Sequence, residues 1–395
     1  MARRTPAAIR LDPRRVAAWR LGRQLIAPAT ATSPEEIAKR LVGVQAQVVS
    51  AAALAVALRS DGLTIDSVPA ALAGRRLVRA WAMRGTLHAF DADDYPVIVG
   101  ALRRRDTWRR PVWFRYFEVT EPEMEALIEA VGVVLDDARP RTRRELAEDV
   151  GRRLGRNIDR QLSSSWGTLL KPAADRGYLI HAAGEGNAVT FTRPSRWIGR
   201  WREVDPDQAI PLVLRRYLAV YGPASTHEVR RWWGGLRSTF IRTALESLGE
   251  TIVTVDVDGS QGLLAAADIP GIEATEPFAG SVHLLGPFDP FIVGAGARDA
   301  LIPSARYGRV SRTAGWISAV VLIDGVVGGI WTSSRAGDQT TVTVELFDRV
   351  TRTMRRRLAA AVDRLGVRLG TPVTLAFGPV HADQPASVAG GADAD

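Results

Sequence analysis

The first 250 residues alternate between stretches with helical periodicity and short pairs of extended segments. Ser33-Pro34-Glu35-Glu36 combines a capping serine, a proline suited to the first helical position and a glutamate that completes a capping box. It predicts a helix that ends near Gly43, and a second helix is expected over residues 48–58. The bulky residues of the segment 77–90 then predict a β-hairpin.

The same cycle recurs twice. In the second repeat, helices are expected over residues 121–136, from Thr142 and from Ser163-Ser164-Ser165-Trp166, followed by two extended pieces within 179–191 around the turn Gly184-Glu185-Gly186-Asn187. In the third, helices are expected over 211–220, from Thr226-His227-Glu228 and over 238–248, followed by strands 252–257 and 261–266 around the turn Asp258-Gly259.

Three helices followed by a hairpin, repeated three times, is the plan of tandem winged-helix modules, in which the third helix usually meets DNA. Helix–helix–helix–hairpin units also occur as protein-interaction modules, and this alternative stays open. The predicted boundaries are 1–115, 116–205 and 206–275 for the three modules. A β-rich C-terminal domain (276–380) and a disordered tail (381–395) follow, so the predicted fold class is α+β.

The C-terminal region has a different pattern. Strands are expected over residues 283–293, 316–323, 326–331 and 340–346, and Asp324-Gly325 is a strong hairpin turn. A basic helix is expected over 348–365. Its arginine face, Arg352, Arg355 and Arg356, is expected to be solvated.

Charge narrows the class of partner. Lysine and arginine number 52 and all but two are arginine, the net charge is +9, and the positive excess lies in the first 250 residues. A guanidinium suits phosphate, so nucleic acid is the first partner to consider, beside the alternative of a general arginine bias. The uncharged run 41–58 could in principle span a membrane, but its amides and alanines indicate a buried helix. The basic N-terminus lacks the apolar core of a secretion signal, and we expect a cytoplasmic, nucleoid-associated protein.

Several kinds of chemistry have no signature here. Cysteine is absent, which excludes disulfides and thiolate chemistry. There is no P-loop, dinucleotide-binding glycine pattern or HExxH motif, so no cofactor is expected. The five histidines are too far apart along the chain to assign a metal site, although a centre made of histidine and aspartate remains open.

Gln45-Ala46-Gln47, at the break between two predicted helices, is the most unusual local feature. Residues two apart point in the same direction in an extended segment and in nearly opposite directions on a helix. Placed after Gly43, the two amides could therefore converge on one point. The alternative is that they cap helix ends or bind neighbouring backbone groups.

Other polar residues stand among apolar neighbours. Strand alternation in 83–88 would place Arg84, Thr86 and His88 on one face, which would suit an anionic ligand; a satisfied buried histidine is the alternative. Asp289, between prolines and phenylalanines, should be held rigidly, to orient a group or to end a strand. A basic loop able to lie along a phosphate backbone carries four arginines: Arg298, Arg306, Arg309 and Arg312.

Four segments in this order resemble a known family: LVGVQAQVVSAAALAVALR (41–59), VRAWAMRGTLHAF (78–90), GPFDPFIVG (286–294) and AGWISAVVLIDGVVGGIW (314–331). The chain is similar, over roughly residues 10 to 378, to the bacterial tandem winged-helix DNA glycosylases of the AlkZ and YcaQ type, which include an azinomycin-resistance enzyme. The resemblance implies three winged-helix units around a concave DNA-binding channel and a β-rich element whose hairpin probes the duplex.

The resemblance also implies a role for the glutamines. The catalytic motif of that family is glutamine, an apolar residue, then glutamine or aspartate, and it falls on Gln45 and Gln47 in the form found in the crosslink-unhooking branch. Arg84 and His88 would then support the active site or bind phosphate, and Asp289 would brace the pocket. The implied activity is that of a monofunctional glycosylase that removes bulky or crosslinked N-alkylpurines from double-stranded DNA, as a monomer and without cofactor or metal. The alternative function is a non-catalytic winged-helix DNA-binding protein or transcriptional regulator.

Overall fold

The computed structural model describes residues 9–155, 162, 167–182, 189–295, 298–312, 315–349 and 351–381. The helix start predicted at 163–166, the turn at 184–187 and the tail from 382 lie outside these residues. The chain forms two compact units. Unit 1 contains residues 1–68, 215–232 and 248–395, and unit 2 contains residues 69–214 and 233–247. Helices and strands occur in both, which confirms the α+β class.

Unit 2 is built around a small antiparallel sheet covered by helices. Its strands pair in the order β4-β3-β6-β7-β5, so the first two predicted wings share one sheet, which the sequence did not suggest. The strands are β3 (Leu77–Trp81), β4 (Leu87–Asp91), β5 (Arg141–Thr142), β6 (Ile180–Ala182) and β7 (Thr190–Thr192). The helices are α5 (Tyr95–Leu102), α6 (Pro111–Phe117), α7 (Glu121–Val134), α8 (Arg143–Leu154), α10 (Lys171–Asp175) and α11 (Pro194–Trp197).

Local capping chemistry explains where the helices of unit 2 begin. Thr120 caps α7 and Thr142 caps α8, and in both cases a glutamate three residues later returns a hydrogen bond to the cap residue. Such reciprocal boxes satisfy backbone N–H groups that the first turn leaves unpaired. The apolar faces of α7 and α8 pack with Phe191 and Trp81 in one buried cluster.

Unit 1 begins with β1 (Ile9–Leu11), α1 (Pro13–Arg23), α2 (Pro34–Arg40), β2 (Val44–Gln45) and α3 (Val49–Ala57). Ser33 caps α2 as predicted, with its hydroxyl 3.1 Å from the Glu36 N–H. The predicted capping box is wrong in one detail, because Glu36 accepts from the backbone and hydroxyl of Thr32 instead of from Ser33. Gly43 ends the helical region as predicted, with φ of 99° and its N–H donated to Ala38.

Four helices lie at or across the limits of the two units: α4 (Ser67–Ala73), α12 (Pro206–Tyr221), α13 (Thr226–Trp233) and α14 (Ser238–Leu248). The third predicted wing is confirmed as the pair β8 (Ile252–Val257) and β9 (Ser260–Ala265), joined at Asp258 and Gly259, which both have positive φ. That conformation suits a two-residue hairpin turn. Strand β1 adds to β8 in parallel, a pairing that local sequence did not reveal.

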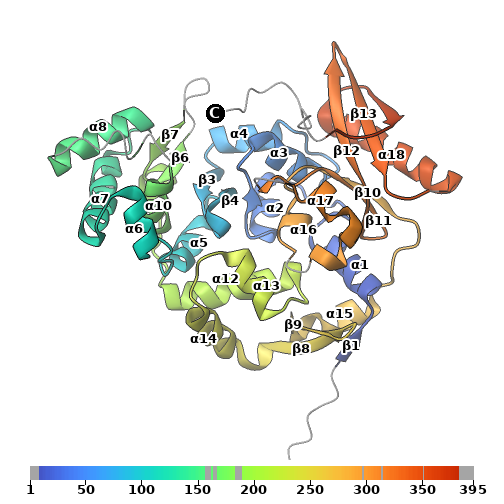
Figure 1. The fold of residues 1–395 in the computed structure, drawn as a ribbon, viewed down its shortest axis with the longest axis horizontal. Helices are drawn as coiled ribbons and strands as arrows, with labels where there is room; N and C mark the ends of the chain where they lie inside the picture. Colours follow the sequence, from blue (N-terminus) through green and yellow to red (C-terminus); the bar gives the residue numbers. More distant parts are fainter. Residues whose placement is uncertain are drawn as a thin grey trace, which may run out of the picture. The chain divides into compact units, whose positions relative to one another are not determined.

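The C-terminal part of unit 1 is a five-stranded sheet in the order β10-β11-β12-β13-β14, with helix α18 against it (Figure 1). Its elements are α15 (Ile269–Ala274), β10 (Val282–Leu285), α16 (Pro290–Val293), α17 (Tyr307–Val310), β11 (Val320–Ile323), β12 (Val326–Ala336), β13 (Gln339–Leu346), α18 (Arg352–Leu369) and β14 (Val373–Phe377). The turn at Asp324 and Gly325 is confirmed. Arg352, Arg355 and Arg356 are exposed on α18, as predicted.

Three predictions for this region are wrong. The strand expected over 283–293 ends at Leu285, because Pro287 and Pro290 cannot donate to a ladder and Asp289 caps the short helix α16. The strand expected from Trp316 begins only at Val320. The basic helix begins at Arg352 instead of 348, with Thr351 as its cap, and extends to Leu369. No helix in the described part of the chain is long and apolar enough to cross a membrane.

Candidate functional site

Gln45 and Gln47 stand on the segment that connects α2 to α3. Gln45 lies in β2, in the extended conformation that the motif required, and is 8% exposed. Ala46 is fully buried, and Gln47 lies on the surface immediately before α3. The motif therefore presents one amide at the edge of the core and one to solvent. Convergence of the two amides on one point stays a prediction.

Two residues in the left-handed backbone conformation set the direction of this segment. Val42 has φ of 57° and Gly43 has φ of 99°, and they turn the chain from α2 into β2. The Tyr221 hydroxyl donates to the Leu41 carbonyl at 3.1 Å, which ties the end of α2 to α12 within unit 1. The left-handed conformation is free of strain for glycine but strained for the branched side chain of valine. The packing around Val42 must therefore hold that residue in this conformation.

Helix α3 gives the motif a rigid continuation, because its residues from Ala51 to Ala57 are all buried. Leu54 joins the cluster formed by the C-terminal sheet and α18. A Cβ at Gly286 would lie 2.8 Å from the Leu54 Cδ2, so the backbone of the Gly286–Gly294 motif approaches α3 more closely than a side chain would allow. Two of the four family-like segments are thus in direct contact.

Arg59 and Asp289 form the strongest link between the same two segments. Arg59 Nη1 lies 2.9 Å from Asp289 Oδ2, and Arg59 Nη2 lies 2.8 Å from Asp289 Oδ1, a bidentate pair. Both side chains are fully buried. The remaining Arg59 donors reach the carbonyls of Gln24 and Ala55 at 2.9 and 2.7 Å. Asp289 also accepts from the Phe291 N–H at 2.9 Å.

This pair makes Asp289 a brace for α3 instead of a solvent-facing group. The motif around Asp289 was predicted to be rigid, whereas its partner Arg59 was missed. The available signal was that the 18 uncharged residues 41–58 end at this arginine. A charge that follows a buried helix needs a buried counter-charge.

Arg84 and His88 come together in unit 2, at the end of the β3–β4 hairpin. The strict alternation expected over 83–88 is wrong, because Met83–Gly85 forms a 3-10 turn and Arg84 has φ of 59°. The turn nevertheless places Arg84 Nη2 3.5 Å from His88 Nε2. The predicted pairing of the two side chains is therefore found, although it arises from a turn instead of from a strand face.

The surroundings of His88 fix its protonation. His88 Nδ1 lies 3.0 Å from the Thr86 carbonyl, which can only accept, so Nδ1 carries the hydrogen and Nε2 is left as an acceptor facing Arg84. Burial, reinforced by the Arg84 charge, lowers the pKa of His88 to about 3. The imidazole is neutral at physiological pH, and Arg84 supplies the positive charge of this pair.

A second ionic group, which the sequence did not indicate, lies beneath this turn. Arg105 Nη1 donates to the Ala82 carbonyl at 2.6 Å and to Asp175 Oδ1 at 3.1 Å, and both side chains are almost completely buried. Burial raises the pKa of Asp175 to about 6, against the opposing effects of Arg105 and Lys171. Lys171 Nζ would lie 3.7 Å from a Cβ at Gly85, so it also approaches the turn.

The four arginines of the predicted basic loop differ in availability. Arg306 is exposed and lies over the Phe347 ring, 5.3 Å from its centre. Arg309 forms an ion pair with Glu345, and Arg312 is half-buried. Arg298 lies 3.5 Å from the Ser311 hydroxyl, and burial together with the neighbouring Arg231 lowers its pKa. Arg306 is thus the member most open to a phosphate.

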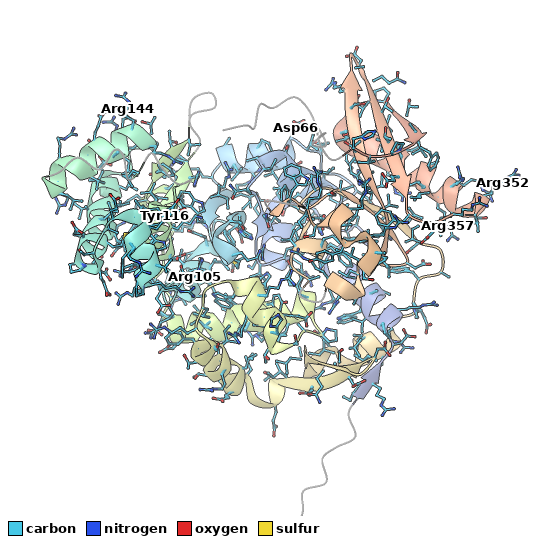
Figure 2. All side chains as sticks on the ribbon, viewed as in Figure 1. Asp66, Arg105, Tyr116, Arg144, Arg352 and Arg357 are labelled. Carbon is cyan, nitrogen blue, oxygen red and sulfur yellow. The ribbon has the colours of Figure 1, made fainter. Side chains whose placement is uncertain are left out.

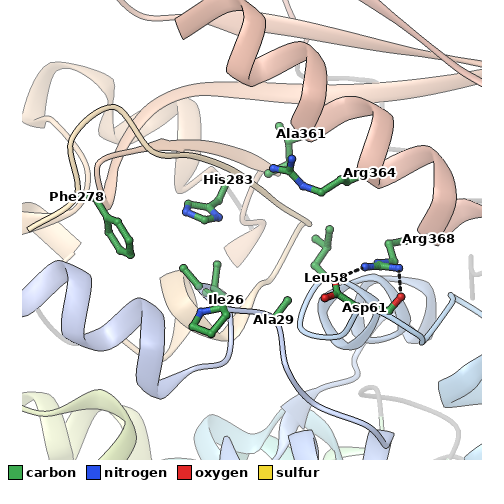
Figure 3. Close-up of a pocket in the computed structure, with 12 residues that line it drawn as sticks. Ile26, Ala29, Leu58, Asp61, Phe278, His283, Ala361, Arg364 and Arg368 are labelled. Carbon is green, nitrogen blue, oxygen red and sulfur yellow. Dashed lines mark hydrogen bonds and ion pairs between the residues drawn. The ribbon is translucent and has the colours of Figure 1, made fainter. Parts of the chain in front are cut away.

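A cavity of about 440 Å³ lies in unit 1, at the C-terminal end of α3 (Figure 3). Leu58, Phe278 and Ala361 contribute apolar walls, and Arg368 bridges to the Asp61 carboxylate at 2.9 Å at its rim. None of the predicted site residues lines this cavity. Among the residues that the structure describes, no three histidine or acidic side chains gather closely enough to hold a metal ion.

Comparison with known proteins gives consistent matches. The profile of the family described as "DNA glycosylase AlkZ-like" matches residues 38–367. An interstrand DNA cross-link repair glycosylase of Streptomyces sahachiroi is 38% identical over 325 residues, which are 80% of this chain and 87% of that protein. The solved structure of the Streptomyces sahachiroi DNA glycosylase AlkZ matches with a TM-score of 0.84 and 33% identity, covering 93% of this chain and 100% of that one.

These matches confirm the resemblance drawn from the four segments and the tandem winged-helix class of the fold. They name a glycosylase and not a transcriptional regulator, which was the alternative left open. They also make DNA the macromolecule on which the chain acts. The chain belongs to the AlkZ-like family of DNA glycosylases.

Proposed function

We propose that this glycosylase hydrolyses the N-glycosidic bond of bulky or crosslinked N-alkylpurines in double-stranded DNA, with Gln45 and Gln47 positioning the attacking water. The observation that carries the proposal is the placement of the motif. An extended Gln45 lies at the edge of the core and Gln47 on the surface, two residues before a helix whose residues 51–57 are all buried. The relative from Streptomyces sahachiroi, named for cross-link repair, supports the choice of substrate class.

Two neutral amides suit this substrate. A guanine alkylated at N7 carries a positive charge, so the bond between C1′ and N9 is already weakened and the base leaves as a neutral molecule without added acid. Water then forms a bond to C1′, and its proton passes to solvent. The amide oxygens can orient that water and stabilise the positive charge that develops on the sugar, although an amide is a poor general base.

The rigid frame around the motif supports this role. Catalysis by positioning requires groups that stay where they are before the substrate arrives. Left-handed residues turn the chain into β2, and the Arg59–Asp289 pair fixes the far end of α3. We assign Asp289 the bracing of this frame and not a contact with substrate.

The arginine candidates are assigned to phosphate contacts. In unit 2, Arg84 stands beside a neutral His88 whose Nε2 can accept one of its hydrogens, an arrangement that orients the guanidinium. In unit 1, Arg306 is the most exposed arginine of the basic loop, and Arg298, Arg309 and Arg312 are assigned a weaker part. We expect the protein to act as a monomer. Since it acts on DNA, we also expect it in the cytoplasm and close to the nucleoid.

A panel of defined lesions tests the substrate class. Duplexes that carry N7-methylguanine, a bulky N7 monoadduct or an N7-linked interstrand crosslink should be incubated with excess protein, and base release scored as abasic sites. Release from the bulky adduct and separation of the crosslinked strands are expected, with slower release of N7-methylguanine. Rapid release of the methylated base alone would overturn the assignment to bulky lesions.

A further inference from the structure

The segment 103–117 of unit 2 is unusually rich in both arginine and aromatic residues. Its sequence, RRRDTWRRPVWFRYF, contains six arginines and five aromatic residues. The second half of this segment forms helix α6, from Pro111 to Phe117. Arginine interleaved with aromatic rings is typical of surfaces that bind nucleic acid.

One face of α6 is committed to the core. Trp113, Phe114 and Phe117 pack against the cluster formed by α7 and α8. The ring centres of Trp113 and Phe117 are 4.4 Å apart, and Trp113 and Phe114 each contact the buried Trp108 edge-on. This packing fixes the orientation of a helix that would be too short to hold itself together.

The opposite face is open. Val112 is 68% exposed and Tyr116 is 75% exposed, and Arg115 is also exposed. Tyr116 is labelled on α6 in Figure 2. Residues three and four apart lie on one face of a helix, so Val112, Arg115 and Tyr116 form a single patch. The valine and the tyrosine give this face a small apolar area beside a cation, which suits contact with a flat ring carried on a charged chain.

Charge identifies the kind of molecule. Four of the six arginines in the segment are neutralised by carboxylates: Arg103 by Glu203, Arg104 by Asp207, Arg105 by Asp175, and Arg109 by Glu121 and Glu125. In the part of the chain that the structure describes, Arg110 and Arg115 have no such partner, and both are exposed. The two uncompensated cations therefore lie on the same short helix as the exposed Tyr116, Arg110 at its N-cap and Arg115 next to Tyr116 in the sequence.

We propose that α6 is a second DNA contact, in which Arg110 and Arg115 bind two phosphates of one strand and the Tyr116 ring stacks on a base that has lost its partner. This deepens the proposed function, since a helix opened around a bulky lesion offers such a base. A tyrosine ring stacks on any base, and the two guanidinium groups of the same helix match the negative charge of the strand. The packed face of α6 holds the exposed Tyr116 in place before DNA binds.

The first test is the salt dependence of DNA binding by the full chain. Each phosphate contact adds about 0.9 to the slope of log K against log salt concentration, so Arg110→Ala with Arg115→Ala should lower the slope by about 1.8. The matched control is Arg152→Ala, because Arg152 is also an exposed arginine of unit 2 but is paired with Asp149. An unchanged slope in the double variant would overturn the phosphate contacts.

The second test is stacking. A duplex with a single unpaired 2-aminopurine should be quenched on binding of the wild type and of Tyr116→Phe, and not on binding of Tyr116→Ala. Tyr116→Ala should also bind this probe roughly tenfold more weakly, as expected for one lost stacking contact. Equal quenching by the Tyr116→Ala variant would overturn the proposal.

These readouts separate the α6 contact from catalysis. Both measure binding to unmodified or mismatched DNA, so they stand even if the wild type releases no base from any lesion. If the Tyr116→Ala variant instead shifts a monomer–dimer equilibrium in sedimentation and leaves both DNA readouts unchanged, the face is an interface between copies and the proposal is wrong.

Discussion

The Arg59 guanidinium and the Asp289 carboxylate, separated by 230 positions in the chain, form two parallel hydrogen bonds of 2.8 and 2.9 Å in a fully buried environment. The pair joins the end of α3 to the cap of α16. Since α3 begins two residues after Gln47, this contact bears on the stability of the candidate active site as well as on that of unit 1.

Breaking the pair on one side should destabilise the protein strongly. Arg59→Met or Asp289→Leu alone leaves an uncompensated buried charge, so each should lower the free energy of unfolding by about 3–5 kcal/mol. The combined variant Arg59→Met with Asp289→Leu should lose much less than the sum of the two. Urea denaturation measures all three. Additive losses would show that the two side chains are not coupled.

The protonation of His88 gives a pH-dependent stability. Burial and Arg84 lower the pKa of His88 in the folded protein to about 3, whereas an unfolded histidine titrates near 6.5. Its contribution to stability is therefore complete above about pH 6.5 and is lost as the pH falls towards 3. Replacement by phenylalanine should flatten the unfolding free energy between pH 4 and 6.5. A resonance assigned to His88, by its loss in the phenylalanine variant, that titrates near 6.5 in the folded protein would contradict the buried neutral ring.

Asp175 should give the opposite dependence of stability on pH. Its folded pKa is raised to about 6 by burial, so folding favours the protonated carboxyl. Asp175 should therefore stabilise the fold most below its unfolded pKa, near 3.9, and this contribution declines as the pH rises through 6. Asp175→Asn, which keeps the shape without the titration, should remove this decline. A decline of the same size in the variant would assign the effect to another group.

Substitution of Gly234 tests how firmly the turn at Arg84 is held. Gly234 has φ of +64°, and an added Cβ would lie 2.6 Å from the Arg84 Cα, whereas Gly155 has φ of +67° and nothing within 4 Å. Both Gly→Ala changes bear the left-handed strain of about 1–2 kcal/mol, but only Gly234→Ala must also displace the turn. Thermal melts should show the larger loss for Gly234→Ala, and its DNA affinity should fall as well. Equal losses of thermal stability in both variants would mean that the turn at Arg84 accommodates the added methyl group without cost.

Local chemistry explains the part of the fold that the sequence predicted well. Thr120 and Thr142 mark helix starts because their hydroxyls satisfy N–H groups only a few residues away. Asp258-Gly259 and Asp324-Gly325 mark hairpins because two consecutive positive φ angles are required there. Each of these signals lies within one short segment of the chain.

The parts that were missed depend on distant residues. The parallel pairing of β1 with β8 and of β14 with β13, and the sharing of one sheet by two wings, join segments far apart in sequence. At the candidate site, the glutamine motif could be predicted from three consecutive residues, but Arg59 acquires its partner only through folding. The 3-10 turn at Arg84 depends on the close packing of Gly85 and Gly234. The alternation of polar and apolar residues does not indicate this packing.

The most direct measurement of the central claim is single-turnover release of a bulky N7-alkylguanine by the Gln45→Ala, Gln47→Ala double variant. The control is Gln261→Ala, an exposed glutamine of the same unit on β9. If the two amides position water and stabilise the developing charge, the double variant should release base at least about 100-fold more slowly while binding the duplex as tightly as wild type. Release at the wild-type rate would contradict the assignment of Gln45 and Gln47.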